Sequence, residues 1–190
     1  AGTLVVAGGA STVATVSDLV TASVGSAIAD KNNVAAAFTN GISDTIGNLA
    51  STGSITATLT KVKNDDSDVA ITISDADNVA MTAADLTAIG SATTGTVTVT
   101  NRTAISGSNT DVTAALVTSG SKVEVSDADV TISDVDNTAI AATVLSNIGS
   151  ETTGTVTATN RIAISGTNTD VTAALVTSGS KVEVSDADVT

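Results

Sequence analysis

The chain has 190 residues, of which 42% are apolar but only 1% aromatic, and it contains no Cys, His, Pro, Trp or Tyr. Its formal net charge is −13, from seven Lys or Arg and twenty Asp or Glu residues. Without His and Cys, the sequence excludes imidazole bases, serine–histidine triads, thiolate nucleophiles and zinc–thiolate sites. The acidic balance and the near absence of aromatic side chains argue against nucleic-acid binding and against an anionic membrane surface.

The N-terminal part, residues 1–71, resembles a diverged version of the repeats that follow it. Its longest apolar stretch, residues 4–29, is interrupted by Asp18 and many hydroxyl residues, so we expect no membrane insertion. The patterns predict strands at Thr3–Val6, Ser54–Thr60 and Val69–Ile73, helical turns in Val13–Ala29 and Val34–Leu49, and an acidic turn at Asn64–Asp68.

The rest of the chain is a tandem repeat. Residues 72–130 align without gaps to residues 131–189, with 47 of the 59 positions identical, and Thr190 corresponds to the first residue of a third copy. A terminal repeat normally diverges in order to cover its open end. We therefore expect a fragment of a longer array, or a subunit whose end is covered by another chain. The predicted units are residues 1–71, 72–130 and 131–190.

Each repeat unit contains two similar halves with a short helix followed by a strand. Asp111 and its copy Asp170 are predicted N-caps, and four glycines are predicted to end helices: Gly90, Gly120, Gly149 and Gly179. Alternating Val with Thr or Glu predicts strands at Thr96–Thr100 and Val123–Val125, and Val130 with Ile132 predicts another.

A core of Val, Ile, Leu and Ala without aromatic residues must be thin and regular. Combined with the repeat, this predicts a β-rich repeat solenoid. In detail, we expect a right-handed parallel β-solenoid with short helical segments along one side.

The acidic segment Ser126–Asn137 is the clearest candidate for a site. It carries five hard oxygen ligands, namely Asp127, Asp129, Asp134, Asp136 and Asn137, and alternation of Asp with backbone carbonyls suits Ca²⁺. The spacing matches neither an EF-hand nor the glycine-rich nonapeptide of calcium-binding β-rolls. The alternative is that these residues cap turns and keep loops solvated. No cofactor is required by this sequence, and Ca²⁺ is the candidate ligand.

Paired carboxylates could also serve a glycosidase, but a catalytic pair is expected once, in a pocket, and not copied with a repeat. The repeated carboxylates therefore favour a structural role. Arg102 and Arg161 occupy equivalent positions and are expected to pair with neighbouring carboxylates.

The segment DNTAIAATVLSNIGSETTGTVTATNRIAISGTNTDVTAALVTSG, Asp136–Gly179, resembles repeats of very large, low-aromatic bacterial surface proteins, notably from marine cyanobacteria, known as β-strand repeat proteins. The segment is also similar to tracts of phage tail-fibre-like proteins. The resemblance implies an extracellular or cell-surface location and a structural role in a filament, coat or giant repeat protein. The alternative is an adhesion or recognition fibre. Other copies of the chain or adjoining repeats are the expected partners, including by head-to-tail assembly.

Overall fold

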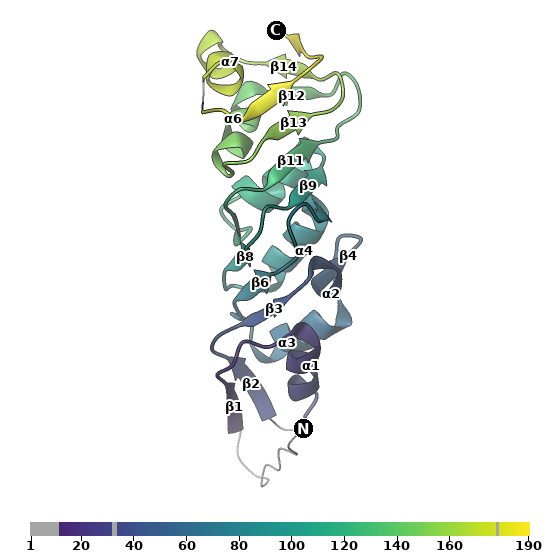
Figure 1. The fold of residues 1–190 in the computed structure, drawn as a ribbon, viewed down its shortest axis with the longest axis vertical. Helices are drawn as coiled ribbons and strands as arrows, with labels where there is room; N and C mark the ends of the chain where they lie inside the picture. Colours follow the sequence, from purple (N-terminus) through teal and green to yellow (C-terminus); the bar gives the residue numbers. More distant parts are fainter. Residues whose placement is uncertain (1–11, 32–33, 178) are drawn as a thin grey trace.

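The structure is a computed structural model that describes residues 12–31, 34–177 and 179–190. The described chain is elongated, with its N-terminal part at one end and its C-terminus at the other (Figure 1). Short strands cross the long axis one above another, and helices lie between successive strands. We call a strand together with the helix packed beside it one level of the stack. The strand Thr3–Val6 predicted from sequence lies outside the described residues.

The elements alternate along the chain. The strands are β1 (Thr12–Val16), β2 (Val34–Phe38), β3 (Ile42–Asp44), β4 (Ala50–Ser51), β5 (Ser54–Ile55), β6 (Ile71–Ile73), β7 (Ala80–Thr82), β8 (Val97–Val99), β9 (Ala104–Gly107), β10 (Val123–Val125), β11 (Asp129–Ile132), β12 (Ala139–Ala141), β13 (Val156–Ala158), β14 (Ala163–Ser165), β15 (Val182–Val184) and β16 (Asp188–Val189). The helices are α1 (Ala22–Ala29), α2 (Ile46–Leu49), α3 (Ala57–Asp65), α4 (Ala83–Ala92), α5 (Asn109–Val112), the π-helical turn η1 (Thr113–Val117), α6 (Ala142–Ser150) and α7 (Asn168–Leu175).

The strands form several small sheets in which the pairing is almost entirely parallel. The order is β10-β8-β6-β3 in one four-stranded sheet, β15-β13-β11-β9-β7 in the five-stranded sheet and β12-β14-β16 in a third. β1 pairs with β2 in parallel, and only β4 and β5 pair antiparallel among the described strands. Neighbours in these parallel sheets are joined through a helix, as parallel pairing requires a crossover connection.

Strand β11 connects the two repeats by belonging to both. It pairs with β9 of the first repeat through Val130 and Ile105, and with β13 of the second repeat through Val130 and Val156. It is the equivalent of β6, which lies one repeat unit earlier in the sequence. The five-stranded sheet therefore combines three strands from each repeat, with β11 counted in both.

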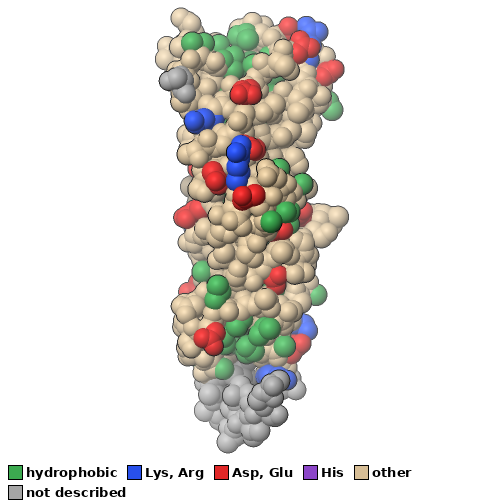
Figure 2. All heavy atoms as spheres, viewed as in Figure 1, with side chains coloured by type: hydrophobic (Ala, Val, Ile, Leu, Met, Phe, Trp, Pro, Cys, Tyr) green, Lys and Arg blue, Asp and Glu red, His purple; other side chains and the backbone are tan. Residues whose placement is uncertain are grey.

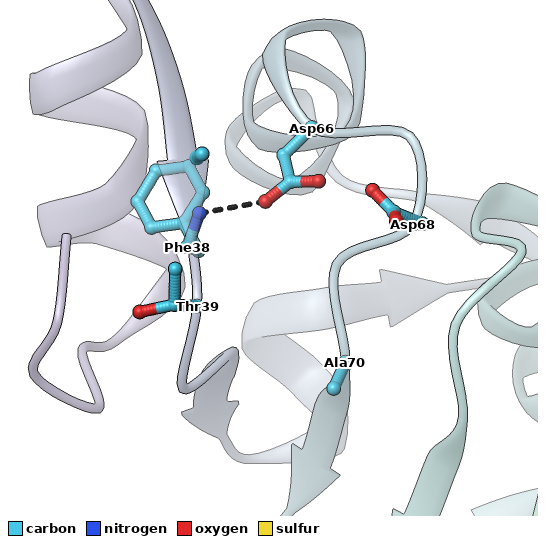
Figure 3. Close-up of a pocket in the computed structure, with 6 residues that line it drawn as sticks. Phe38, Thr39, Asp66, Asp68 and Ala70 are labelled. Carbon is cyan, nitrogen blue, oxygen red and sulfur yellow. Dashed lines mark hydrogen bonds between the residues drawn. The ribbon is translucent and has the colours of Figure 1, made fainter. Parts of the chain in front are cut away.

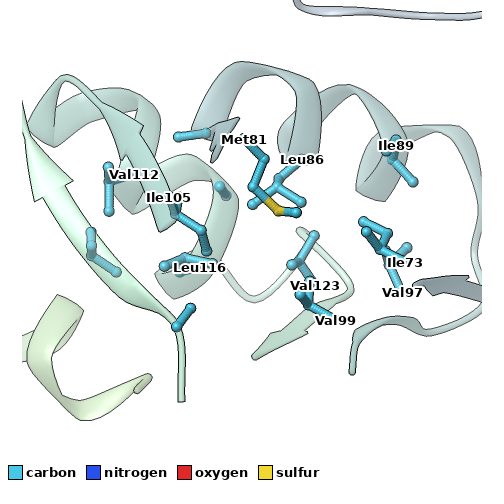
Figure 4. Packing of buried hydrophobic residues seen from close by; sticks show 14 of the residues in the cluster. Ile73, Met81, Leu86, Ile89, Val97, Val99, Ile105, Val112, Leu116 and Val123 are labelled. Atoms are coloured by element: carbon cyan, nitrogen blue, oxygen red, sulfur yellow. The ribbon is translucent and has the colours of Figure 1, made fainter. Parts of the chain in front are cut away.

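The core is one continuous cluster that follows the long axis. Figure 4 shows Ile73, Ile89 and Val97 meeting at one level and Ile105, Val112 and Leu116 at another, with side chains from helices packed against side chains from strands. All six are buried. Because each full burial of such an aliphatic side chain contributes roughly 1.5–3 kcal/mol, the stack gains stability at each level without needing aromatic residues.

Two of the four glycines predicted to end helices have a different role. Gly90 and Gly149 do not end helices but lie inside α4 and α6, where both are buried. A Cβ at Gly90 would overlap the carbonyl oxygen of Ser121, and one at Gly149 would overlap that of Ser180. These positions need glycine because the helix touches the backbone of the next level. Gly120 does follow the helical segment that ends with η1, and it faces open space.

The N-caps also lie earlier in the sequence than predicted. Ser108 and Thr167 are the N-caps, and their hydroxyls accept hydrogen bonds from the backbone N–H groups of Asp111 and Asp170. Around α7 the Asp170 carboxylate also accepts from the Thr167 N–H, which completes a capping box.

Residues 12–71 are more helical, and differently arranged, than predicted. Ser54–Thr60 was expected to be a strand, but most of it belongs to α3, which begins at Ala57 after a capping Thr56. Val34–Leu49 was expected to contain a helical stretch, and it does so in the short α2, but most of the range forms β2 and β3. Alternating Thr matches a strand pattern, whereas here Leu59 and Val62 are buried on one helix face, so burial decides.

The prediction of a β-rich, right-handed parallel β-solenoid is therefore wrong. The chain has a mixed α/β fold with several separate parallel sheets and seven α-helices within the described residues, and it is not a closed solenoid. Two physical causes are visible. The apolar spacing of three and four residues extends through whole helices such as α4. The sheets also stay separate, because the β3 to β10 sheet ends at β10 while β9 and β11 belong to the five-stranded sheet, so no one sheet runs the length of the described chain.

Candidate functional site

The five residues predicted to bind Ca²⁺ lie around β11 and the two turns that flank it. Asp127 precedes the strand, Asp129 begins it, and Asp134, Asp136 and Asn137 follow it. The structure gives these side chains and backbones separate interactions, which connect neighbouring levels of the stack.

Asp134 contacts the first turn of a helix in the neighbouring level. Its carboxylate accepts a hydrogen bond from the backbone N–H of Asn109 at 2.6 Å and another from the Asn109 side-chain amide at 2.8 Å. Asp75, the counterpart of Asp134 in the preceding unit, accepts from the Ile46 N–H at 2.6 Å, and Asp44 accepts from the Ala22 N–H at 3.0 Å. A carboxylate at the first turn of a helix satisfies a free donor and complements the helix dipole.

Asp129 forms an ion pair with Arg102. The guanidinium donates to both carboxylate oxygens, with the shortest N–O distance at 2.7 Å. The hydrogen bond from Arg102 lowers the pKa of Asp129, and a second from the Thr155 N–H contributes in the same direction. The pair recurs between Arg161 and Asp188 at 2.6 Å, so the expected pairing of both arginines is confirmed.

The remaining predicted ligands lie near these arginines. The hydrogen bond to Asp129 raises the pKa of Arg102, and the charge of Asp127 adds to this. The hydrogen bond to Asp188 likewise raises the pKa of Arg161, and the charge of Asp136 adds to it. Figure 2 shows the resulting pattern on one face, where basic side chains lie close to acidic ones and uncharged surface separates the groups. Asn137 has a positive φ of 63°, and its backbone N–H donates to the carbonyl of Arg161 at 2.6 Å. Asn tolerates this backbone conformation better than most residues.

Across the described part of the chain, no group of three or more Asp or Glu residues is arranged to hold a metal ion. Asp129 and Asp134 accept hydrogen bonds from protein donors, an arrangement that needs no ion. Ca²⁺ binding by this segment stays a prediction, and capping of turns is the alternative with visible contacts.

The second recurrent contact joins a Thr-Thr-Gly segment to the acidic turn of the preceding level. The Thr152 hydroxyl donates to the carbonyl of Ala128 at 2.6 Å, and the Thr153 N–H donates to the carbonyl of Ser126 at 3.0 Å. Gly154 then passes so close that a Cβ would overlap the carbonyl oxygen of Ala128 and lie 2.7 Å from that of Asp127.

The first repeat makes the same contact with the turn before β6. The Thr93 hydroxyl donates to the carbonyl of Val69 at 2.7 Å, and the Thr94 N–H donates to that of Ser67 at 2.9 Å. A Cβ at Gly95 would overlap the carbonyl oxygen of Asp68 and lie 2.8 Å from that of Val69, the equivalents of Asp127 and Ala128. The two repeats therefore share this geometry, and we name the segment the Thr-Thr-Gly clasp (residues 93–95 and 152–154).

A pocket of about 250 Å³ opens in the N-terminal part between β2 and the end of α3. Figure 3 shows Phe38, Thr39 and Ala70 around it, with the carboxylates of Asp66 and Asp68 on one side. Asp66 accepts from the Phe38 N–H at 2.6 Å. Burial raises the pKa of Asp66, and the neighbouring Asp68 raises it further. The pocket presents two acidic groups and one aromatic face.

The sequence patterns did not lead to the Thr-Thr-Gly clasp, to Ser108 and Thr167 as the N-caps, or to the contact of Asp134 with the start of a helix. A signal for the clasp was present, because Thr-Thr-Gly occurs at the same position in both repeats and glycine there needs a reason. A signal for the caps was also present, since Ser or Thr followed three residues later by Asp resembles a capping box.

Among the described helices, none is both long and apolar enough to cross a membrane. Comparison of the chain with models of protein families, with curated proteins and with solved structures found no match.

Proposed function

We propose that this chain is a non-catalytic structural module of an extracellular or cell-surface filament, coat or giant repeat protein. The observation that carries the proposal is the way one repeat continues into the next. β11 pairs with strands of both repeats, so the second repeat extends the sheet of the first instead of folding beside it.

The chemistry of the repeats supports this proposal. The carboxylates of the acidic segment bind helix ends and arginines of adjacent levels, and these contacts recur in successive copies. Such contacts align levels with one another. They leave the copied carboxylates occupied by structural interactions.

The shape of the molecule also supports a spacer or scaffold. The stack is elongated, its ends lie far apart, and its core continues through the described length (Figure 1). A flexible linker of equal length would have an end-to-end distance that grows only with the square root of residue number. A stacked module lengthens by the same increment for every repeat.

Small-angle X-ray scattering on this chain and on versions with one and two added copies of residues 131–189 tests the module. We expect the maximum dimension to rise by equal increments, whereas a Gly/Ser tail as long as one repeat unit, the matched control, should add a smaller and less defined increment. Immunogold labelling of intact source cells with antibodies against the chain tests the surface location. A maximum dimension that does not grow, or label found only inside cells, would contradict the proposal.

A further inference from the structure

The strand position represented by β6, β11 and β16 occurs three times, at intervals of one repeat unit. β6 lies between β3 and β8, and β11 lies between β9 and β13. β16 has β14 on one side, and no described strand lies against its other edge. One of three equivalent strands therefore presents an open edge.

The two covered copies show the same contacts at that edge. The N–H of Ile71 donates to the carbonyl of Thr96 at 2.9 Å, and the N–H of Val130 donates to that of Thr155 at 2.8 Å. In each case the Thr-Thr-Gly clasp that precedes the added strand binds the turn before the covered strand. The register is also the same, because Ile71 pairs with Val97 and Val130 pairs with Val156.

The uncovered copy keeps the residues that make these contacts. Ser185-Asp186-Ala187-Asp188-Val189 repeats Ser126-Asp127-Ala128-Asp129-Val130 without change. In β16 the N–H groups of Asp188 and Thr190 bond to Ile162 and Ile164 of the β14 side, so the Val189 N–H faces the open edge, as that of Val130 faces β13.

Burial shows that this edge is apolar and incomplete. Val130 is 1% exposed, whereas Val189 is 51% exposed. Ala128 is fully covered and Ala187 only partly, although it packs against the core. The missing strand accounts for the difference, since local sequence is identical.

We infer that the outer edge of β16, with the turn 185–187, is a docking site for a Thr-Thr-Gly-Thr-Val strand of a further copy of this repeat. The incoming strand lies parallel to β16, with its Val opposite Val189. Its first Thr hydroxyl donates to the carbonyl of Ala187, and its second Thr N–H donates to the carbonyl of Ser185. Its Gly passes over the carbonyl oxygens of Asp186 and Ala187, where a Cβ has no room, as Gly154 passes over those of Asp127 and Ala128.

The occupant is a further repeat and not a second folded copy of the chain. In a folded copy, β8 already lies between β6 and β10, and β13 lies between β11 and β15. Both Thr-Thr-Gly strands of such a copy are therefore taken. A further repeat supplies a free one, and its equivalents of β13 and β15 would complete with β12, β14 and β16 a five-stranded sheet like that of β7 to β15.

The test is amide hydrogen exchange, measured by NMR on the chain and on a version in which residues 132–189 are repeated after Thr190. The Val130 amide is the internal reference for a covered edge. In the chain itself we expect the Val189 amide to exchange fast. In the extended chain we expect its exchange to slow by at least about tenfold, because it becomes a ladder hydrogen bond protected by the fold.

Two control extensions separate specific docking of the clasp from non-specific covering of the β16 edge. In one, the added residue that corresponds to Gly154 is replaced by Val, and the Val189 amide should then still exchange fast. In the other, the added residue that corresponds to Thr152 is replaced by Val, which removes one hydroxyl bond and should give intermediate protection. Unchanged protection of Val130 shows in each case that the parent part is folded.

Three outcomes would overturn the inference. The Val189 amide could exchange as fast in the extended chain as in the chain itself. It could be protected equally in the extension whose added glycine, the equivalent of Gly154, is replaced by Val, which would show that the edge is covered without the clasp. It could already be protected in the unextended chain and lose protection on dilution, which would assign the edge to a second copy. None of these results depends on the location or role tested under the proposed function.

Discussion

Replacing Gly90 by Ala should be strongly destabilising although it puts a better helix former inside a helix. Gly90 lies in α4, and its missing Cβ leaves room for the backbone of residue 121 in the next level. A Cβ would overlap the Ser121 carbonyl oxygen, lie 2.9 Å from its carbonyl carbon and lie 3.1 Å from Cγ2 of Val123. Two of these three atoms are backbone, so no rotamer change can relieve the contact.

The size of the effect follows from two opposing terms. Ala instead of Gly inside a helix contributes roughly 1 kcal/mol of stability through backbone entropy and propensity. Overpacking costs typically about 1–3 kcal/mol where side chains can adjust, and here the helix must separate from the next level. With backbone atoms in the overlap, the cost lies at the upper end of that range, about 3 kcal/mol, and we expect a net loss of about 2 kcal/mol in the free energy of unfolding.

Urea unfolding followed by circular dichroism measures this loss as a lower midpoint. Gly120→Ala is the matched control, because nothing lies within 4 Å of a Cβ there and its φ is not positive. That variant should stay within about 0.5 kcal/mol of the parent. Gly149→Ala should behave like Gly90→Ala. Equal midpoints for Gly90→Ala and Gly120→Ala would refute the packing argument and restore the interpretation of Gly90 as a simple helix stop.

Four further predictions concern other parts of the chain. Thr103 is buried with a hydroxyl that has no hydrogen-bond partner, and its counterpart is the apolar Ile162, so Thr103→Val should raise stability by about 1–2 kcal/mol in urea unfolding, and an unchanged midpoint would count against this. Thr167→Ala removes an N-cap and should cost about 1 kcal/mol, and full retention of the melting temperature would contradict the capping geometry. Because burial raises the pKa of Asp66, the folded state holds that proton more tightly than the unfolded state, so its contribution to stability is present below the unfolded pKa and is lost as pH rises through the folded pKa. Asp66→Asn should flatten this fall in stability over weakly acidic pH, and an unaltered slope would exclude Asp66 as its source. If the acidic segment 126–137 binds Ca²⁺ as its composition predicts, Ca²⁺ should raise the melting temperature where chelator and Mg²⁺ do not, and an identical midpoint in all three would reject the site.

The elements within the repeats were largely predictable, because each is marked by a local pattern. Val alternating with Glu gives β10 where it was expected, and Val with Thr gives β8 at the centre of the predicted range. The pairing of Arg102 with a carboxylate was also predictable, since an isolated cation in an acidic chain has many partners.

The arrangement of those elements was not predictable from the same patterns. Nothing in the local sequence of Val130 shows that its strand pairs with one repeat on each edge, because that depends on the lateral offset between levels. The role of Gly90 depends in the same way on the backbone of Ser121, which is distant in sequence and in contact in space. Composition was enough to find the acidic segment. It could not show that Asp134 would bind the start of a helix while Asp129 would bind Arg102.

The equal spacing of β6, β11 and β16 has a genetic consequence. Each point of one repeat unit has a structural equivalent in the next, and β11 is at once the end of one unit and the beginning of another. A duplication or deletion of one whole unit therefore rejoins matching positions wherever its breakpoints fall within the tandem region. Changes in length by whole units preserve every strand partner, whereas a change by any other number shifts the pairing of all levels beyond it.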